Sequence, residues 1–235
     1  MFSRLLSYPQ TWKRLLDFLA AFFGIILLSP VFLVIALIIK LRCGGAVIYS
    51  QPRIGRNFQP FNIYKFRTMT SAADGVVSPC TVKGDPRITK TGQILRKSKL
   101  DELPQLFNVL IGDMSLVGPR PEVGQYVEMF KEQYSIVLSV RPGITNGATL
   151  EYINEEDILF QLVSLTAKEL GSVKTFPRYA TPHEAYVNEI IPLKLALYKK
   201  YIQQQSFWLD LKIIIETMWK LSRPYREKSR LLIKL

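Results

Sequence analysis

The sequence has few of the residues that build disulfide frameworks and histidine-based sites. Its 235 residues include two cysteines and one histidine. Cys43 and Cys80 show neither a disulfide framework nor the CxxC spacing of a zinc site, which suits a reducing compartment. The single histidine, His183, excludes a histidine-based metal cluster and is a poor basis for a Ser-His-Asp triad. Its position after Thr181-Pro182 favours a loop.

Common nucleotide-binding motifs are also absent. The sequence contains no GxxxxGK[ST] loop, which argues against ATP hydrolysis of the Walker type. No GxGxxG follows a predicted strand, and no DxD is present that would hold the metal of a conventional glycosyltransferase.

Negative charge is scarce relative to positive charge. There are 31 Lys and Arg residues against 19 Asp and Glu residues, a net charge of +12. Such an excess indicates a polyanionic partner, which could be nucleic acid, anionic lipid or a phosphorylated substrate. Charge alone does not choose among them.

One long uncharged run is present, at residues 18–39. Its length matches that of a helix that crosses a bilayer core. It is too long for a cleavable signal peptide and lacks a small-residue cleavage site. Basic residues flank both ends, with Lys13 and Arg14 before it and Lys40 and Arg42 after it. Because basic flanks favour the cytoplasmic side, two basic flanks conflict with a simple span.

Ser29-Pro30 lies in the middle of this run. Proline removes one backbone hydrogen bond and predicts a kink, and the Ser29 hydroxyl could bond a freed carbonyl. Each half of about eleven residues is too short to cross a bilayer alone. Two interpretations stay open from the residues: a re-entrant helix that leaves on the side it entered, and a kinked spanning helix.

The remaining sequence predicts short strands followed by helices. The expected strands are residues 46–51 and 61–69, joined by a turn at 52–60. Loops are expected at 69–86 and 113–122. The expected helices are residues 91–98, 101–112, 123–139, 154–171, 181–204 with a break at Pro192, and 206–221. In the last helix Trp208, Leu211, Ile215 and Trp219 share one face, a pattern typical of either an interfacial helix or a core-facing one.

Asp101 and Glu102 are the candidate reactive pair. Asp101 is expected to cap the following helix with Pro104 in the first turn, where free N–H groups and the helix dipole favour an ionised carboxylate. An ionised carboxylate can act as a nucleophile. Adjacent residues do not face each other on a regular helix, so a working pair requires irregular geometry. Ordinary helix capping is the alternative interpretation.

Basic residues surround this pair in the sequence. They are Lys65, Arg67, Arg87, Lys90, Arg96, Lys97, Lys99 and Arg120. Arginine forks match phosphate oxygens, and lysine supplies a point charge. A pyrophosphate beside two carboxylates also favours Mg²⁺, which takes few protein ligands. The alternative for each basic residue is a solvated surface charge.

From about Lys13 to Leu221 the sequence closely resembles the bacterial sugar transferase family, the monotopic phosphoglycosyl transferases. The matching pieces are residues 13–30, 51–69, 85–122 and 141–145. The resemblance implies a re-entrant helix broken at Ser29-Pro30. It also implies transfer of a sugar phosphate from a UDP-sugar to undecaprenyl phosphate, with release of UMP.

The same resemblance implies the roles of the site residues. Asp101 would be the nucleophile that forms a covalent phosphosugar intermediate. Glu102 would assist with metal binding or proton management, and both carboxylates would be ligands of a Mg²⁺ cofactor. The residues expected to contact phosphate or nucleotide are Lys65, Arg67, Arg96 and Arg120.

The resulting expectation for the fold is an α+β, mainly helical monotopic membrane domain. Residues 1–42 would form the re-entrant helix. Residues 43–235 would form a catalytic domain with a small sheet and C-terminal interfacial helices, at the cytoplasmic face of the bacterial inner membrane. The chain would be a short-form member with membrane lipids as partners, without nucleic acid, and a homodimer is compatible with this. It would catalyse the first membrane step of exopolysaccharide, O-antigen or other glycoconjugate assembly.

One segment departs from the family pattern. After residues 141–145 many relatives continue with Gly-Trp-Ala-Gln, whereas this chain has residues 146–159 of different sequence, which leaves the sugar open. Two other functions are weighed against the transferase. One is a membrane-anchored protein that binds polyanions without catalysis, and the other is a glycosyltransferase that releases UDP.

Overall fold

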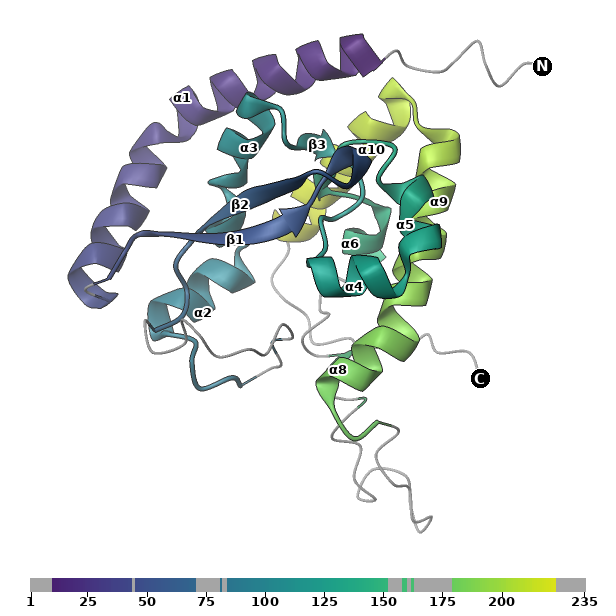
Figure 1. The fold of residues 1–235 in the computed structure, drawn as a ribbon. Coiled ribbons are helices and arrows are strands. Elements are labelled where there is room, and N and C mark those ends of the chain that lie inside the picture. The colour runs from purple at the N-terminus through teal and green to yellow at the C-terminus, as the bar shows by residue number, and fades with distance from the viewer. Residues whose placement is uncertain are drawn as a thin grey trace.

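The computed structural model describes residues 10–43, 45–70, 81, 84–151, 158–159, 162 and 179–222 (Figure 1). The elements are α1 (Gln10–Cys43), β1 (Ile48–Ile54), η2 (Arg56–Phe58), β2 (Pro60–Phe66), α2 (Lys90–Lys97), η4 (Leu100–Glu102), α3 (Gln105–Ile111), β3 (Ser115–Val117), α4 (Gly124–Met129), α5 (Lys131–Val137), β4 (Gly143–Thr145), α6 (Gly147–Glu151), α8 (Pro182–Ala185), η5 (Tyr186–Ile190), α9 (Ile191–Gln204) and α10 (Phe207–Ser222). Among the described residues helices dominate and the strands are few and short, so the α+β class is confirmed.

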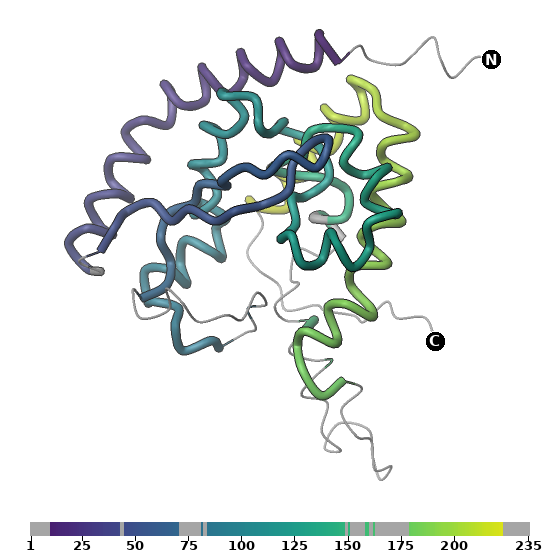
Figure 2. Tube along the Cα trace, in the orientation of Figure 1, coloured from purple at the N-terminus to yellow at the C-terminus, as the bar shows by residue number. Residues whose placement is uncertain are grey.

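The long helix α1 runs without interruption through Pro30 and bends near its middle (Figures 1 and 2). Pro30 has no N–H to donate to the carbonyl of Ile26, four residues earlier. The Ser29 hydroxyl donates to that same carbonyl at 2.8 Å. The predicted substitute bond at this proline is therefore present, and it keeps the helix intact across the bend.

One face of α1 packs against the rest of the protein and the other is apolar and exposed. Ala21, Ile35 and Ile39 on the inner face are buried. On the outer face Leu27 is 79% exposed and Leu33 is 71% exposed. Within the described residues, α1 is the one helix long and apolar enough to cross a membrane, and little of its most apolar stretch is buried. Because a core helix would be covered, this exposure is consistent with membrane association.

Two small sheets lie beside α1 and α3. β1 and β2 form an antiparallel hairpin in which Ile48 pairs with Phe66 and Ile54 pairs with Pro60. The expected turn at 52–60 was too long, because its first three residues extend β1. β3 and β4 form a parallel pair, and β3 lies in the segment 113–122 that was expected to be a loop. This pair brings two glycines together: a Cβ on Gly143 would lie 2.0 Å from the backbone nitrogen of Gly118.

Two of the expected helices are divided differently. The helix expected at 123–139 is two helices, α4 and α5, separated at Phe130, whose φ and ψ of −121° and 37° are not helical. The break expected at Pro192 was wrong. The π-helical turn η5 precedes α9, and Pro192 lies in the first turn of α9, so the chain continues as helix. Most of the helix expected at 154–171 lies outside the described residues.

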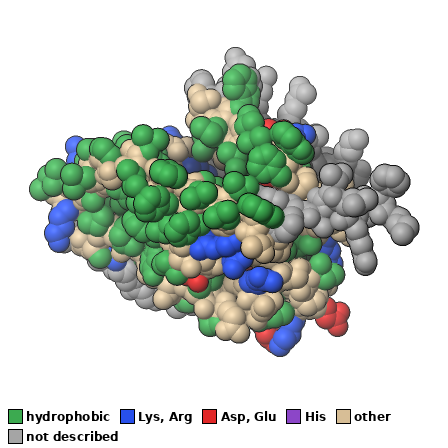
Figure 3. All heavy atoms as spheres, turned by 90° about the horizontal axis from the view of Figure 1, so that it is seen from above, with side chains coloured by type: hydrophobic (Ala, Val, Ile, Leu, Met, Phe, Trp, Pro, Cys, Tyr) green, Lys and Arg blue, Asp and Glu red, His purple; other side chains and the backbone are tan. Residues whose placement is uncertain are grey.

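The C-terminal helix α10 is tied to the start of α1 and exposes its aromatic face. Lys13 forms a buried ion pair with Asp210, which also accepts a hydrogen bond from the Tyr201 hydroxyl at 2.7 Å. On the opposite face Trp208 is 73% exposed and Trp219 is 58% exposed. The core-facing interpretation of this stripe was therefore wrong. Seen from above α1, hydrophobic side chains cover much of the surface, and Lys and Arg side chains border them (Figure 3).

Candidate active site

The two candidate carboxylates lie on the turn between α2 and α3. Asp101 and Glu102 belong to the 3-10 turn η4, and the preceding Lys99 has a left-handed backbone with φ of 56°. Both carboxylates are buried, with 6% of Asp101 and 9% of Glu102 exposed. The irregular turn thus supplies the geometry that a regular helix would deny to adjacent residues.

Asp101 does not have the capping role expected from the sequence. Pro104 occupies the N-cap position of α3, and neither η4 nor α3 begins with a side-chain cap. The 3-10 turn places Asp101 one turn too early to cap α3. Its Oδ1 atom is buried and has no hydrogen-bond partner within the described chain. Since buried polar atoms are rarely left unpaired, this oxygen needs an explanation beyond helix capping.

Glu102 is held firmly by two cations. Arg120, in the loop after β3, donates Nη2–H to Oε1 at 2.5 Å and Nη1–H to Oε2 at 3.2 Å. Lys65, on β2, donates to Oε1 at 3.2 Å. The two-pronged contact from Arg120 is the strong form of a carboxylate–guanidinium pair and fixes the orientation of Glu102.

The same environment moves the two pKa values in opposite directions. Burial alone would raise the pKa of Glu102, but Arg120 and Lys65 outweigh burial and hold it well below its usual range. Burial raises the pKa of Asp101, and the neighbouring charge of Glu102 raises it further. The sequence predicted that free N–H groups and the helix dipole would favour ionised Asp101. That prediction was wrong in direction, because burial and Glu102 favour the protonated form. Burial also lowers the pKa of Lys65. Two carboxyl groups with divergent pKa values are typical of a pair with divided roles.

The other basic residues predicted near the site differ in whether they lie near the carboxylate pair. Arg96, on α2, donates to the Thr68 hydroxyl at 3.0 Å, and its charge acts on Asp101. Arg67 donates instead to the carbonyl of Ala46 at 2.9 Å, beside the start of β1. Arg87 pairs with Asp85 at 2.6 Å, so its charge is already matched locally.

Two residues near the pair were not among the site residues chosen from the sequence, although Lys99 was named among the basic residues around it. The charge of Lys99 acts on both carboxylates, and its adjacency to Asp101 was a usable signal. Gln105, one turn after the pair, is fully buried, and both polar atoms of its amide are without hydrogen bonds within the described residues. Nothing in the sequence distinguished this glutamine from a surface residue.

The described residues contain no group of three or more metal-ligating side chains. Mg²⁺ does not require one, because it commonly binds one or two carboxylates and completes its shell with water and phosphate oxygens. The unpartnered Oδ1 of Asp101 fits such a ligand. Both oxygens of Glu102 already accept from Arg120 or Lys65, which makes Asp101 the better placed of the two.

Taken together, the fold and the site define an α+β protein that holds a buried carboxylate pair among cations beneath an exposed apolar helix. The chain belongs to the bacterial sugar transferase family, whose model matches residues 8–224.

Named relatives are similar over most of this chain. A UDP-N-acetylgalactosamine-undecaprenyl-phosphate N-acetylgalactosaminephosphotransferase from Aeromonas hydrophila is 36% identical over 209 residues, which cover 88% of this chain and 42% of that protein. A UDP-glucose:undecaprenyl-phosphate glucose-1-phosphate transferase from Escherichia coli is 34% identical over 212 residues, covering 88% and 39%. The exopolysaccharide production protein ExoY from Rhizobium meliloti is 34% identical over 221 residues, covering 88% and 83%. The chain thus spans less than half the length of the first two relatives.

Proposed function

We propose that this chain is a phosphoglycosyl transferase that moves a sugar 1-phosphate from a UDP-sugar to undecaprenyl phosphate. Two relatives whose names state this kind of reaction support the substrate classes. The observation that carries the proposal is the pairing of a buried, unpartnered oxygen on Asp101 with a neighbouring Glu102 locked by Arg120 and Lys65. One carboxylate is fixed, and the other is available to bond to phosphorus.

The reaction proceeds in two displacements. Asp101 Oδ1 attacks the phosphorus that bears the sugar, a new P–O bond forms, and the bond to UMP breaks so that UMP leaves. An oxygen of undecaprenyl phosphate then attacks the same phosphorus and breaks the bond to Asp101. The product is undecaprenyl diphosphate sugar, and the free carboxylate is restored.

The surrounding residues have separable roles in this scheme. Arg120 and Lys65 keep Glu102 ionised and in place. Arg96 and Lys99 supply positive potential where the phosphates must approach Asp101. Mg²⁺, when bound with Asp101 and the substrate, would neutralise part of the pyrophosphate charge. Because the pKa of Asp101 is raised, the ionised nucleophile is lost as the pH falls through that pKa.

The bent helix α1 supports a re-entrant position in the bacterial inner membrane, with the site on the cytoplasmic face. Lys13 near one end of α1 pairs with Asp210, and Ile39 near the other end packs with Phe66 and Leu95. Both ends therefore pack against the same folded body, which supports the re-entrant position over a spanning helix. The outer face of the bend carries the apolar side chains that a bilayer would cover.

The test is a nucleotide-release assay with a panel of UDP-sugars, undecaprenyl phosphate and Mg²⁺. We expect UMP from the unaltered chain, none from Asp101→Asn, and unchanged membrane association in both. The exposed-site variant Glu128→Gln is the matched control and should keep full activity. A peptide containing Asp101 should gain the mass of one phosphosugar. Release of UDP, or full activity of Asp101→Asn, would contradict the proposal.

A further inference from the structure

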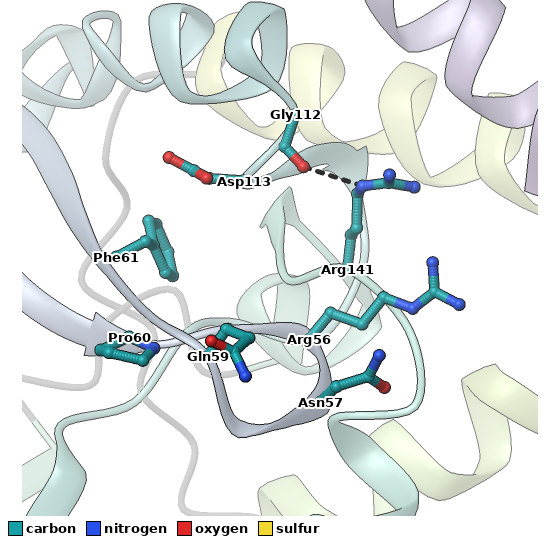
Figure 4. A pocket seen from close by; sticks show the side chains of 9 residues that line it. Arg56, Asn57, Gln59, Pro60, Phe61, Gly112, Asp113 and Arg141 are labelled. Atoms are coloured by element: carbon teal, nitrogen blue, oxygen red, sulfur yellow. Dashed lines mark hydrogen bonds between the residues drawn. The ribbon is translucent and has the colours of Figure 1, made fainter.

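A second cationic site lies at the far end of α3 from the carboxylate pair. A cavity of about 190 Å³ opens between the β1–β2 turn and the end of α3 (Figure 4). A single buried water needs only about 10–15 Å³ by a comparable measure, so the cavity has room for a larger group. Its lining residues are Gly55, Arg56, Asn57, Gln59, Pro60, Phe61, Gly112, Asp113 and Arg141.

Two arginines of this lining point the same way. Figure 4 shows the guanidinium groups of Arg56 and Arg141 extending toward the same side of the cavity. The Nε–H group of Arg141 donates a hydrogen bond to the Gly112 carbonyl at 2.8 Å. The buried Nε of Arg56 has no hydrogen-bond partner within the described chain. One guanidinium donor beside the cavity, the Arg56 Nε–H, is therefore not satisfied by the described residues.

A third arginine adds to the positive charge. Arg14, on α1, binds the carbonyls of Val109 and Leu110 at the end of α3. Its Nη2 lies 3.2 Å from where a Cβ on Gly112 would be. Burial lowers the pKa of Arg141, and the charges of Arg14 and Arg56 lower it further. The positive charges of Arg14 and Arg56 therefore lie close enough to Arg141 to act on it.

The counter-charge within the cavity is small. Asp113 is the acidic member of the lining, and Figure 4 shows its carboxylate directed away from both guanidinium groups. The buried Asp17 lies outside the lining, and its negative charge also acts on Arg141. Three arginines against two carboxylates still leave an excess of positive charge, which favours an anion, and the planar arginine forks match phosphate oxygens.

The cavity is distinct from the carboxylate pair and lies close to the apolar surface. The pair precedes α3 and Gly112 follows it, and seven helical residues at 1.5 Å each separate the two by about 10 Å or more. Arg14, which lies beside Gly112 of the lining, belongs to α1, and its neighbours Trp12 and Leu15 are 61% and 45% exposed. A ligand here would lie at the border of the apolar face.

We propose that this cavity binds the phosphate group of an anionic phospholipid at the membrane surface, apart from the catalytic site. A soluble phosphate is the other source of the same chemistry. The membrane position rests on the proposed function, whereas the phosphate site itself does not, because its test measures binding and not transfer. The bound headgroup would anchor α1, α3 and the β1–β2 turn to one another.

The experiment measures thermal unfolding of the full chain in neutral detergent micelles during titration with phosphatidylglycerol or phosphatidylcholine. We expect phosphatidylglycerol to raise the melting temperature and phosphatidylcholine to leave it unchanged. Arg56→Gln should weaken the apparent affinity for phosphatidylglycerol at least tenfold. Lys131→Gln removes an equal charge from an exposed side chain and should bind as the unaltered chain does.

Two further measurements test the proposal. A titration with inorganic phosphate at constant ionic strength separates the sources: Arg56-dependent stabilisation by phosphate without phosphatidylglycerol would overturn the lipid assignment. Asp113→Asn removes the opposing charge and should strengthen phosphatidylglycerol binding severalfold, which gives a test even if Arg56→Gln fails to fold. Equal lipid affinity in the unaltered chain and both cavity variants, or an equal loss in Lys131→Gln, would overturn the site.

Discussion

Neutralising Glu102 should destabilise the fold, whereas neutralising the adjacent Asp101 should stabilise it. Glu102→Gln leaves Arg120 and Lys65 largely buried without their acceptor charge. Removing one partner of a buried pair costs about 3–5 kcal/mol, and the partial exposure of both cations reduces this to about 2–3 kcal/mol. Asp101→Asn removes a buried charge whose Oδ1 is unpartnered, and should stabilise the fold by about 1 kcal/mol at neutral pH.

The dependence on pH separates the two effects further. The pKa of Glu102 is depressed in the folded chain, so its stabilisation is present above the ordinary value of about 4.3 and is lost as the pH falls through the folded pKa. The pKa of Asp101 is raised, so its ionisation costs nothing below about 3.9 and costs progressively more as the pH rises toward the folded pKa. Both variants should therefore approach the unaltered chain in acid and diverge from it at pH 7.

The assay is urea unfolding in mild detergent at several pH values, with Glu128→Gln as the control. Glu128 is exposed and pairs with exposed Lys131, so this control should shift stability by less than about 0.5 kcal/mol. If Asp101→Asn and Glu102→Gln shift stability in the same direction at pH 7, the assigned electrostatic asymmetry is wrong. Shifts that do not vary with pH would also refute it.

Two further substitutions test the packing around the site. Gly143→Ala places a methyl group 2.0 Å from the backbone of Gly118 and should lower the free energy of unfolding by about 3 kcal/mol or more. Gly147→Ala has open space around it and should change that free energy by less than about 0.5 kcal/mol. Equal unfolding midpoints for the two variants would contradict the described β3–β4 pairing. Gln105→Met replaces a buried amide without described partners by an apolar side chain and should stabilise the chain by about 1–2 kcal/mol in the same unfolding assay; a loss of stability would reveal a hydrogen bond to that amide.

Structural features were predictable where residues close together in the sequence determine them. The uncharged run from residue 18 to 39 is long enough that no other local structure competes with a helix, and α1 contains it. The substitute bond from Ser29 to Ile26 follows from the missing N–H of Pro30 alone. The alternation of residues 61–69 predicted β2 for the same reason, since period two is a property of the strand itself.

Features that depend on distant residues were mispredicted or missed. The parallel pairing of β3 with β4 joins segments more than twenty residues apart, and three-residue strands carry no pattern of their own. Asp101 was assigned to a helix cap because the local residues favour one, but the 3-10 turn formed by Leu100–Glu102 displaced it. The opposite pKa shifts of the pair arise from burial and from Arg120, eighteen positions further along the chain.

The sequence by itself therefore determined the apolar helix and the excess of positive charge, because these reside in composition and in neighbouring residues. It nominated Asp101 and Glu102 as the reactive pair, which stays a prediction. The tertiary structure alone decided that Arg120 and Lys65 bind Glu102 and that one oxygen of Asp101 has no described partner. It also decided that Arg56 and Arg141 line a cavity beside α3, with Arg14 close by. Each of these features depends on which side chains from distant parts of the sequence come close and on how much water they exclude. The strength of an interaction between charges depends on the same two factors.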